Sequence, residues 1–373
     1  MHALLRRARR TSKWRLAPAD QSNERGQVLL VRKLLAACVR NSGRAWFTQS
    51  TWFEPVLPTL YVTPLCNLRC TYCEDFGAHR NAGYRGQTLS LESVKKLISL
   101  IAAECDVLYV TGGEPTMRAD LPELLRHARW RGIRYLAMNT NAIRLREHEE
   151  ILQLLDNLVI SLDDLTAGRW DSTLAADPER VAALLDDIRW AAAEQRRREF
   201  ALTVTCVVTP GRVAAARRVR DFVYEIGAQF SAQHLSVNRL PSPALTADPE
   251  YAAFMRELLA DKRAGRGVSG SEQYLARPGA CATSACTPTA APHIDWMGRL
   301  AYPCRELPDH VLVDLLAAGS LREALREGAR RWGAPPTDCH RCGERCYVEI
   351  SSLVRHPTAL AREAVHYLRS ASR

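Results

Sequence analysis

The 373-residue sequence lacks any run of 18 uncharged apolar residues, so no transmembrane helix is expected. Its N-terminus has arginines but no uninterrupted apolar segment with a small-residue cleavage site, which argues against a secretory signal. Residues 51–373 also lack a basic excess. Residues 1–50 hold eleven Lys or Arg and two acidic residues, so nearly all of the net charge of +10 lies there. Because nucleic-acid backbones bind to clustered positive charge, nucleic acid is not expected as a partner.

The composition, with 47% hydrophobic and 25% charged residues, is that of a water-soluble globular protein. Twelve cysteines in a chain without an export signal indicate a reducing compartment, and we expect a cytoplasmic location. In that environment, clustered cysteines bind metal more often than they form disulfides.

Three cysteines stand close together directly after an extended, β-branched and aromatic run at residues 60–63. Cys66, Cys70 and Cys73 have C-x3-C-x2-C spacing. Three thiols on a loop that leaves a strand can converge on one soft inorganic centre. A cluster of four irons would keep one iron without a protein ligand, and metal sites do chemistry at such open positions.

The same spacing is compatible with a buried helix or with zinc. The positions i, i+4 and i+7 fit one buried helix face, but the interleaved Asn67 and Arg69 are poor core residues and Pro64 interrupts the pattern. The cysteines would also suit a zinc site, although no His or fourth Cys follows nearby.

Extended and helical patterns alternate from Leu57 onward. This alternation predicts a partial parallel (β/α)6 TIM-like barrel, an α/β fold, over residues 57–264. We expect its strands at 60–63, 107–111, 133–139, 158–162, 200–208 and 234–237, and its helices at 89–104, 119–130, 145–155, 178–196 and 213–226.

Four of these strands end in cysteines, glycines or polar residues that could bind a ligand. They are the three cysteines, then Gly112-Gly113-Glu114-Pro115, Asn139-Thr140-Asn141 and Ser161-Leu162-Asp163. The carboxyl ends of parallel strands form one rim of a β/α barrel, where active sites are built. Taken singly, the glycine pair and Asn141 also suit ordinary turns, and Ser161 and Asp163 suit a helix cap.

Cys66, Cys70, Tyr72 and Cys73 together resemble the C-x3-C-x-aromatic-C signature of the radical S-adenosylmethionine (radical SAM) superfamily. The resemblance implies a [4Fe–4S] cluster on the three cysteines, with S-adenosylmethionine on the open iron. It further implies a 5'-deoxyadenosyl radical that takes a hydrogen atom from the substrate. Residues expected to bind the cofactor are Tyr72 near the adenine, Gly112, Gly113, Glu114 and Pro115 near the methionyl amino group, and Asn141, Ser161 and Asp163 at strand ends.

A second set of six cysteines follows a Gly/Ser/Arg-rich stretch at 265–270, which we predict to be a linker. The set comprises Cys281, Cys286, Cys304, Cys339, Cys342 and Cys346. One alternative is that these cysteines bind zinc, because a zinc ion needs only four such ligands. The segment from Ile294 to Cys346 resembles the SPASM or Twitch extension of radical SAM enzymes. That resemblance implies one auxiliary [4Fe–4S] cluster on Cys304, Cys339, Cys342 and Cys346, with Cys281 and Cys286 as alternative ligands or a second, incomplete site.

The basic N-terminal extension, residues 1–56, contains an amphipathic helix at 27–41. Such a helix either packs on the barrel or lies on an anionic membrane or acidic partner. Residues 57–264 would then form the barrel and residues 265–373 the Cys-rich auxiliary-cluster domain. Cys38, Cys105 and Cys206 lie in apolar periodic stretches and are expected in the core.

The expected function is that of a radical SAM oxidoreductase or maturase. Family analogy favours oxidative modification or crosslinking of a peptide or protein, and the basic N-terminus makes a lipid-like substrate the alternative. An external reductant such as flavodoxin or ferredoxin would supply the electron. A non-catalytic, zinc-bound scaffold is the alternative from another class.

Overall fold

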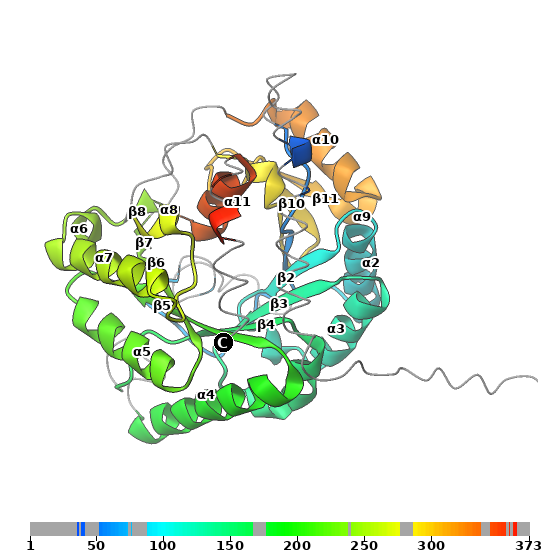
Figure 1. Ribbon diagram of the computed structural model, residues 1–373. Helices are drawn as coiled ribbons and strands as arrows, with labels where there is room; N and C mark the ends of the chain where they lie inside the picture. The colour runs from blue at the N-terminus through cyan, green and yellow to red at the C-terminus, as the bar shows by residue number, and fades with distance from the viewer. Residues whose placement is uncertain are drawn as a thin grey trace, which may run out of the picture.

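A computed structural model describes residues 36, 39–41, 52–73, 76, 88–166, 177–237, 240–276, 286–336, 344–355, 358 and 361–363. Its centre is one curved sheet with the strand order β11-β10-β9-β1-β2-β3-β4-β5-β6 (Figure 1). Strands β1 to β6 are parallel to their neighbours, as predicted for a partial barrel. In the described part the sheet is open, with β6 and β11 at its two edges.

Strands and helices alternate through the first two thirds of the chain, because a parallel strand needs a crossover connection before the next one. The strands are β1 (Thr59–Tyr61), β2 (Val107–Thr111), β3 (Tyr135–Thr140), β4 (Asn157–Ser161), β5 (Ala201–Val208) and β6 (Gln229–His234). The connecting helices are α2 (Leu91–Ala102), η2 (Pro115–Met117), α3 (Leu121–Trp130), η3 (Leu145–Leu154), α4 (Pro178–Arg198) and α5 (Val213–Glu225).

Helix α2 illustrates how the sequence specifies these helices. It begins after Ser90, whose Oγ accepts a hydrogen bond from the Ser93 amide at 3.2 Å. Its buried side chains recur with the spacing of one helix face and pack into the main core. They are Val94, Leu97, Ile98 and Ile101.

The C-terminal third extends the same sheet beyond β1. Strand β9 (His293–Ile294) pairs in parallel with β1, and β10 (Arg299–Tyr302) and β11 (Val311–Asp314) follow antiparallel. Residues 293–302 therefore form the hairpin that the sequence resemblance implies. Helix α10 (Leu321–Trp332) begins after Ser320, which caps the Glu323 amide at 3.0 Å. The remaining elements here are η4 (Pro288–Ala290) and α9 (Leu315–Ala318).

Two of the helices that follow β6, α8 (Glu272–Leu275) and α11 (Arg345–Arg355), lie between the β6 edge and the β10 edge of the sheet in Figure 1. Helix α11 is held there by Arg345, which bonds to the Ser231 hydroxyl of β6 and, at 2.9 Å, to the Ser269 hydroxyl. The other elements are β7 (Ser236–Val237), β8 (Leu240–Pro241), α6 (Pro243–Thr246) and α7 (Pro249–Arg263). No helix among the described residues is long and apolar enough to cross a bilayer.

Three sequence predictions of local structure are wrong. The sixth strand is 229–234 rather than 234–237, because Phe230, Ala232 and His234 are the side chains that bury on one face of β6. The predicted helix at 145–155 is the 3₁₀ helix η3, which is kinked at His148. Residues 265–270 are not a free linker, since the Phe230 amide donates to the Gly267 carbonyl at 2.7 Å and Val268 is buried.

The N-terminal extension is described only in part. Within the helix predicted at 27–41, residues 36 and 39–41 are described and all of them are helical. Cys38 and the rest of the proposed apolar face lie outside the described residues. Cys105 and Cys206 are buried in the core, as predicted.

Candidate active site

The three clustered cysteines lie on the loop that follows β1, the strand at the middle of the sheet. Cys66, Cys70 and Cys73 are each half-buried, and no helix forms between them. The alternative of a buried helical stripe, which the interleaved polar residues already disfavoured, is therefore excluded. The Leu68 amide donates to the Cys66 sulfur at 3.4 Å, and the Phe76 amide donates to the Cys73 sulfur at 3.3 Å. Such N–H groups stabilise thiolates, the form in which cysteine binds metal.

This donor set suits a cluster rather than one ion. Within the described ranges, no three or more His, Cys, Asp or Glu side chains converge as they would around a single metal ion. A four-iron cluster makes a different demand, because each thiolate binds a different iron and the sulfurs stay farther apart. The three thiols lie on one short loop and are partly accessible, so they are candidates to bind such a cluster.

The Gly112-Gly113 pair lets the loop after β2 pack directly against the cysteine loop. A Cβ atom on Gly113 would lie 2.3 Å from the Leu65 carbonyl oxygen, and one on Gly112 would lie 2.6 Å from that of Thr63. Both distances are too short for any side chain. The amides of Gly113 and Glu114 instead donate to the carbonyls of Thr63 at 2.8 Å and Leu65 at 2.7 Å. The glycines thus fix the path of the chain into Cys66.

The Glu114 carboxylate is buried and joins the ends of β2 and β3. It accepts hydrogen bonds from the Thr116 amide at 3.0 Å and hydroxyl at 2.7 Å. It also accepts from the Thr140 hydroxyl and the Asn141 amide, each at 2.7 Å. Burial raises the pKa of Glu114 above its usual value, while these donors hold it down. Its side chain therefore organises the rim, and Pro115 begins η2 beside it.

Asn141 continues this network into the cysteine loop. Its side-chain amide donates to the Asn67 side-chain oxygen at 2.7 Å. Asn67 lies between Cys66 and Cys70, so the loop is tied to the end of β3 through Asn141. Asn67 carries no motif of its own, and its only sequence signal is its position inside the cysteine spacing. Thr140 was indicated only as the middle residue of Asn139-Thr140-Asn141.

Asp163, just after β4, is a second point of attachment for the loop. The Tyr72 hydroxyl donates to one of its oxygens, and the Val207 amide donates to the other at 2.7 Å. Burial raises the pKa of Asp163 to about 6, against the lowering effect of these hydrogen bonds. Burial, followed by the neighbouring Asp163 and Cys70, raises the pKa of Tyr72 well above its usual value. Tyr72 therefore lies between a cluster cysteine and the end of β4.

Ser161 lies apart from this network, in a cavity of about 440 Å³ inside the half-barrel. Its hydroxyl donates to the Asn139 side-chain oxygen at 3.4 Å. Most of its lining residues have polar side chains, because these strands direct Thr, Ser, Asn and Gln inward. Helix α11 and the residue before it close the cavity with Glu344, Arg345 and Glu349.

Two cysteines of the second set meet beside α11. Cys304 and Cys286 pack in one small core with Tyr347 and Ile350 of that helix. Burial, with a smaller effect of the neighbouring Cys286, raises the pKa of Cys304 to about 12. The Ser351 hydroxyl donates to the Cys286 sulfur at 3.6 Å. Cys346 belongs to α11, whereas Cys281, Cys339 and Cys342 lie outside the described residues.

Aromatic rings connect the two cysteine regions. Phe76 contacts Tyr61 with ring centroids 5.9 Å apart, and Tyr61 contacts His293 at the same distance. His293 stacks on Tyr347 at 4.9 Å. The β1 loop and the C-terminal segment are thus packed as one unit.

The fold and the site define the class of protein: an open β/α barrel whose carboxyl rim presents three thiols suited to an iron–sulfur cluster. Residues 60–212 match the Radical SAM superfamily. These residues form a radical SAM domain, and that family implies a [4Fe–4S] cluster and S-adenosylmethionine as cofactors.

Curated relatives are similar over part of their length. A probable GTP 3',8-cyclase from Metallosphaera sedula is 34% identical over 172 residues, which cover 44% of this chain and 51% of that protein. The GTP 3',8-cyclase of Synechococcus elongatus is 36% identical over 34% of this chain and 40% of its own length. The chain thus spans about half or less of the curated relatives that it matches.

Solved structures share the fold over more of the chain. Streptococcus suis SuiB bound to the precursor peptide SuiA has a TM-score of 0.59 and 17% identity, covering 82% of this chain and 73% of SuiB. Native anSMEcpe with bound AdoMet has a TM-score of 0.55 and 14% identity, covering 85% of this chain and 99% of that one. These likenesses extend beyond the superfamily match and show a common fold.

Proposed function

We propose that this protein is a radical SAM enzyme that oxidatively modifies or crosslinks a peptide or protein. Cys66, Cys70 and Cys73 would hold the catalytic cluster. The observation that carries the proposal is the placement of these thiols on a β1 loop fixed by two glycines within a superfamily domain. With bound S-adenosylmethionine, that cluster supplies the radical that takes a hydrogen atom from a substrate.

The protein's own residues would bind and orient the cofactors. Glu114 and Asn141 keep the cysteine loop against the ends of β2 and β3, while Tyr72 and Asp163 keep it against β4 and β5. The loop backbone at Gly112 to Pro115 would lie beside the methionyl group. Ser161 faces the inner cavity, where its hydroxyl is placed to hold polar parts of a ligand. Enclosure by the half-barrel keeps water from the reacting atoms.

A peptide is the better supported substrate class. The fold shared with SuiB and anSMEcpe covers more than four fifths of this chain, and structures of both proteins contain peptides. The curated cyclases, in contrast, match a third to less than half of it. A lipid-like substrate would depend on the basic N-terminal helix, most of which lies outside the described residues. Flavodoxin or ferredoxin would serve as the reductant.

An auxiliary [4Fe–4S] cluster would lie at the C-terminal cysteines. Cys286 and Cys304 share one core beside α11, the helix that contains Cys346. This placement favours Cys286 as a ligand with Cys304, whereas the sequence resemblance left it as an alternative. Cys281, Cys339 and Cys342 remain candidates, and such a cluster could accept an electron from a substrate radical.

Anaerobic reconstitution tests the proposed reaction. With iron, sulfide, dithionite and S-adenosylmethionine, the protein should form 5'-deoxyadenosine, which mass spectrometry would measure. Two four-iron clusters predict about eight irons and eight sulfides per chain. Replacing Cys66, Cys70 and Cys73 together by Ala should abolish the product and remove about four irons. A zinc-loaded, iron-free protein, or unchanged product formation by the triple variant, would contradict the proposal.

A further inference from the structure

Arg355, the last residue of α11, is a half-buried arginine that lies over an aromatic ring. Its guanidinium carbon is 5.1 Å from the centre of the Phe53 ring. The Nε atom is buried and has no hydrogen-bond partner within the described part of the chain. A ring face attracts a cation, but a guanidinium also carries N–H groups that need an acceptor. The Phe53 ring alone therefore does not satisfy this side chain.

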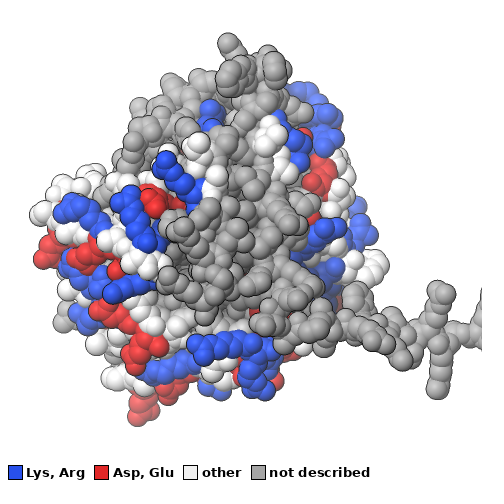
Figure 2. Space-filling view, viewed as in Figure 1, with Lys and Arg blue, Asp and Glu red and all other residues white. Residues whose placement is uncertain are grey.

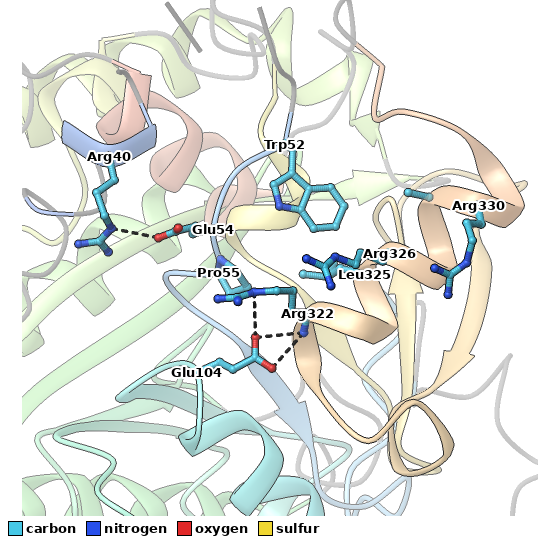
Figure 3. A pocket seen from close by; sticks show the side chains of 10 residues that line it. Arg40, Trp52, Glu54, Pro55, Glu104, Arg322, Leu325, Arg326 and Arg330 are labelled. Atoms are coloured by element: carbon cyan, nitrogen blue, oxygen red, sulfur yellow. Dashed lines mark hydrogen bonds and ion pairs between the residues drawn. The ribbon is translucent and has the colours of Figure 1, made fainter. Parts of the chain in front are cut away.

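Many other arginines of this protein have a carboxylate beside them. In the surface pocket between Trp52 and helix α10, for example, Arg40 pairs with Glu54 at 3.0 Å (Figure 3). Figure 2 shows a similar mixture over one face of the molecule, where Lys and Arg lie among Asp and Glu. Arg355 differs, because no carboxylate of the described ranges contributes to its electrostatic surroundings.

The helix face that carries Arg355 also contacts Cys286. Ser351 and Arg355 are four residues apart on α11, so their side chains are neighbours on one face. The Ser351 hydroxyl donates to the Cys286 sulfur at 3.6 Å and accepts from the Thr287 amide at 2.8 Å. Arg355 therefore lies one helical turn beyond the residue that contacts Cys286.

Phe53 connects Arg355 to the same cysteines from a second direction. This ring belongs to the small core that contains Cys304 and against which Cys286 packs. Thr289 fixes its backbone, because the Thr289 hydroxyl accepts from the Phe53 amide at 3.0 Å and donates to the Phe53 carbonyl at 2.9 Å. The guanidinium is therefore held over the core in which Cys286 and Cys304 meet.

The electrostatics of this core favour an anionic group beside Arg355. Burial lowers the pKa of Arg355, and the neighbouring Cys286 acts in the opposite direction. The guanidinium stays charged, because arginine does not lose its proton in proteins. A half-buried charge without an opposite partner costs free energy. Cysteines bind metal as thiolates, so a metal centre on Cys286 and Cys304 would bring the missing negative charge.

We propose that Arg355 tunes the auxiliary site: its positive charge raises the reduction potential of an iron–sulfur cluster bound by Cys286 and Cys304. A four-iron cluster on thiolates is anionic, and reduction by one electron makes it more negative. A cation beside the cluster stabilises the reduced form more than the oxidised form, and groups around a cluster set its potential in this way. The cluster then becomes a better acceptor for the electron that the proposed reaction removes from the substrate radical.

Because the auxiliary cluster belongs to the proposed function, this role of Arg355 rests on that function. It requires no particular substrate, however, and it can be measured without S-adenosylmethionine. Charge rather than packing is the property assigned to Arg355, so variants that separate the two properties decide the matter.

The test is a redox titration of the auxiliary cluster alone, monitored by electron paramagnetic resonance. The full chain with Cys66→Ala, Cys70→Ala and Cys73→Ala, reconstituted with iron and sulfide, is the parent protein and should retain only that cluster. In this parent, Arg355→Met keeps a long side chain over Phe53 but removes the charge. It should lower the equilibrium constant for reduction about tenfold, which is a shift of about 59 mV to lower potential for a one-electron couple. Arg355→Lys keeps the charge and should stay within about threefold of the parent.

A matched control removes the same charge from another aromatic ring. The guanidinium carbon of Arg131 lies 5.5 Å from the centre of the Trp130 ring, at the exposed end of α3 and outside the small core. Arg131→Gln should leave the potential unchanged. Arg355→Gln is a second uncharged variant and should behave as Arg355→Met does. Circular dichroism checks that each variant is folded.

Two outcomes would overturn this role for Arg355 and leave the auxiliary cluster established. One is a potential in Arg355→Met equal to that of the parent. The other is an equal shift in Arg355→Lys and Arg355→Met, since the side chain would then act through packing. A parent protein that binds no iron would instead refute the auxiliary cluster of the proposed function, and the role of Arg355 with it. Iron analysis of the parent therefore distinguishes the two failures.

Discussion

At the scale of single residues, the site depends on groups that position the cysteines rather than on the cysteines alone. Glu114 uses both carboxylate oxygens within the protein. Asn141 and Asp163 bind the cysteine loop through Asn67 and Tyr72, respectively. A loop fixed at several points holds its thiols in place before the cluster arrives, and such preorganisation is what a functional site requires.

Gly113→Ala should disturb this loop. Its Cβ would lie 2.3 Å from the Leu65 carbonyl oxygen, so the β1 loop must shift. We expect a loss of about 1–3 kcal/mol in the free energy of unfolding, as for other overpacked sites, and about half of the iron to be lost. Denaturant unfolding and iron analysis measure the two effects.

Gly132→Ala provides the control. Nothing lies within 4 Å of its Cβ position, although its φ of +95° makes the substitution strained. The substitution should lower the free energy of unfolding by about 1 kcal/mol, because alanine disfavours this backbone conformation. It should leave the iron content unchanged. If the Gly113→Ala variant bound as much iron as the wild-type protein, the close approach of Gly113 to Leu65 would not be what positions the thiols.

At the scale of elements, β6 shows what the sequence pattern leaves undecided. The predicted strand at 234–237 contains the alternation typical of a strand, yet the pairing partner β5 selects 229–234. That choice buries Phe230 and His234 and directs Ser231 and Gln233 into the inner cavity. A one-residue change of register would reverse these faces, so only packing against β5 fixes the strand.

His234 on β6 predicts a pH dependence of stability. It is 4% exposed, and neither ring nitrogen has a hydrogen-bond partner within the described part of the chain. Burial lowers the pKa of His234 to about 4. The unfolded chain, with a histidine pKa near 6.5, binds the proton more readily, so stability falls as pH drops from about 6.5 towards 4.

Between pH 7 and pH 5 this effect should cost about 2 kcal/mol of unfolding free energy. In His234→Phe, which keeps the ring beside Tyr274, that portion of the pH dependence should disappear. Urea unfolding of both proteins at the two pH values measures the difference. An identical pH dependence in the variant would mean that His234 does not titrate as its burial requires.

At the scale of the whole molecule, the C-terminal segment and the barrel form one sheet. Strand β9 pairs with β1, the strand that leads into Cys66, Cys70 and Cys73, and the ring contacts from Phe76 to Tyr347 connect the same regions. An auxiliary cluster beside α11 would therefore be built on the edge of the structure that supports the first cluster.

Cys286→Ala and Cys304→Ala together test that auxiliary site. The double variant should lose about four irons and keep the other four, since the β1 loop is unchanged. It should still form 5'-deoxyadenosine. Its unfolding temperature should be lower than that of the wild-type protein, because a cluster that binds only the folded state stabilises that state. Iron and sulfide analysis with thermal unfolding provides the measurements.

Cys105→Ala is the matched control, because Cys105 belongs to neither set and is buried in a separate small core with Val107, Tyr135 and Ala137. It should keep all of the iron. An undiminished iron content in the double variant would remove Cys286 and Cys304 from the auxiliary site.

The sequence by itself determined the parallel β/α order, most element positions and the residues at the strand ends, because these depend on local periodicity and on short motifs. Only the tertiary structure decided which distant groups meet: Glu114 with Thr140, Tyr72 with Asp163, Cys286 with Cys304, and α10 with Trp52. Contacts between residues far apart in the chain follow from strand pairing and core packing, and no local pattern encodes them.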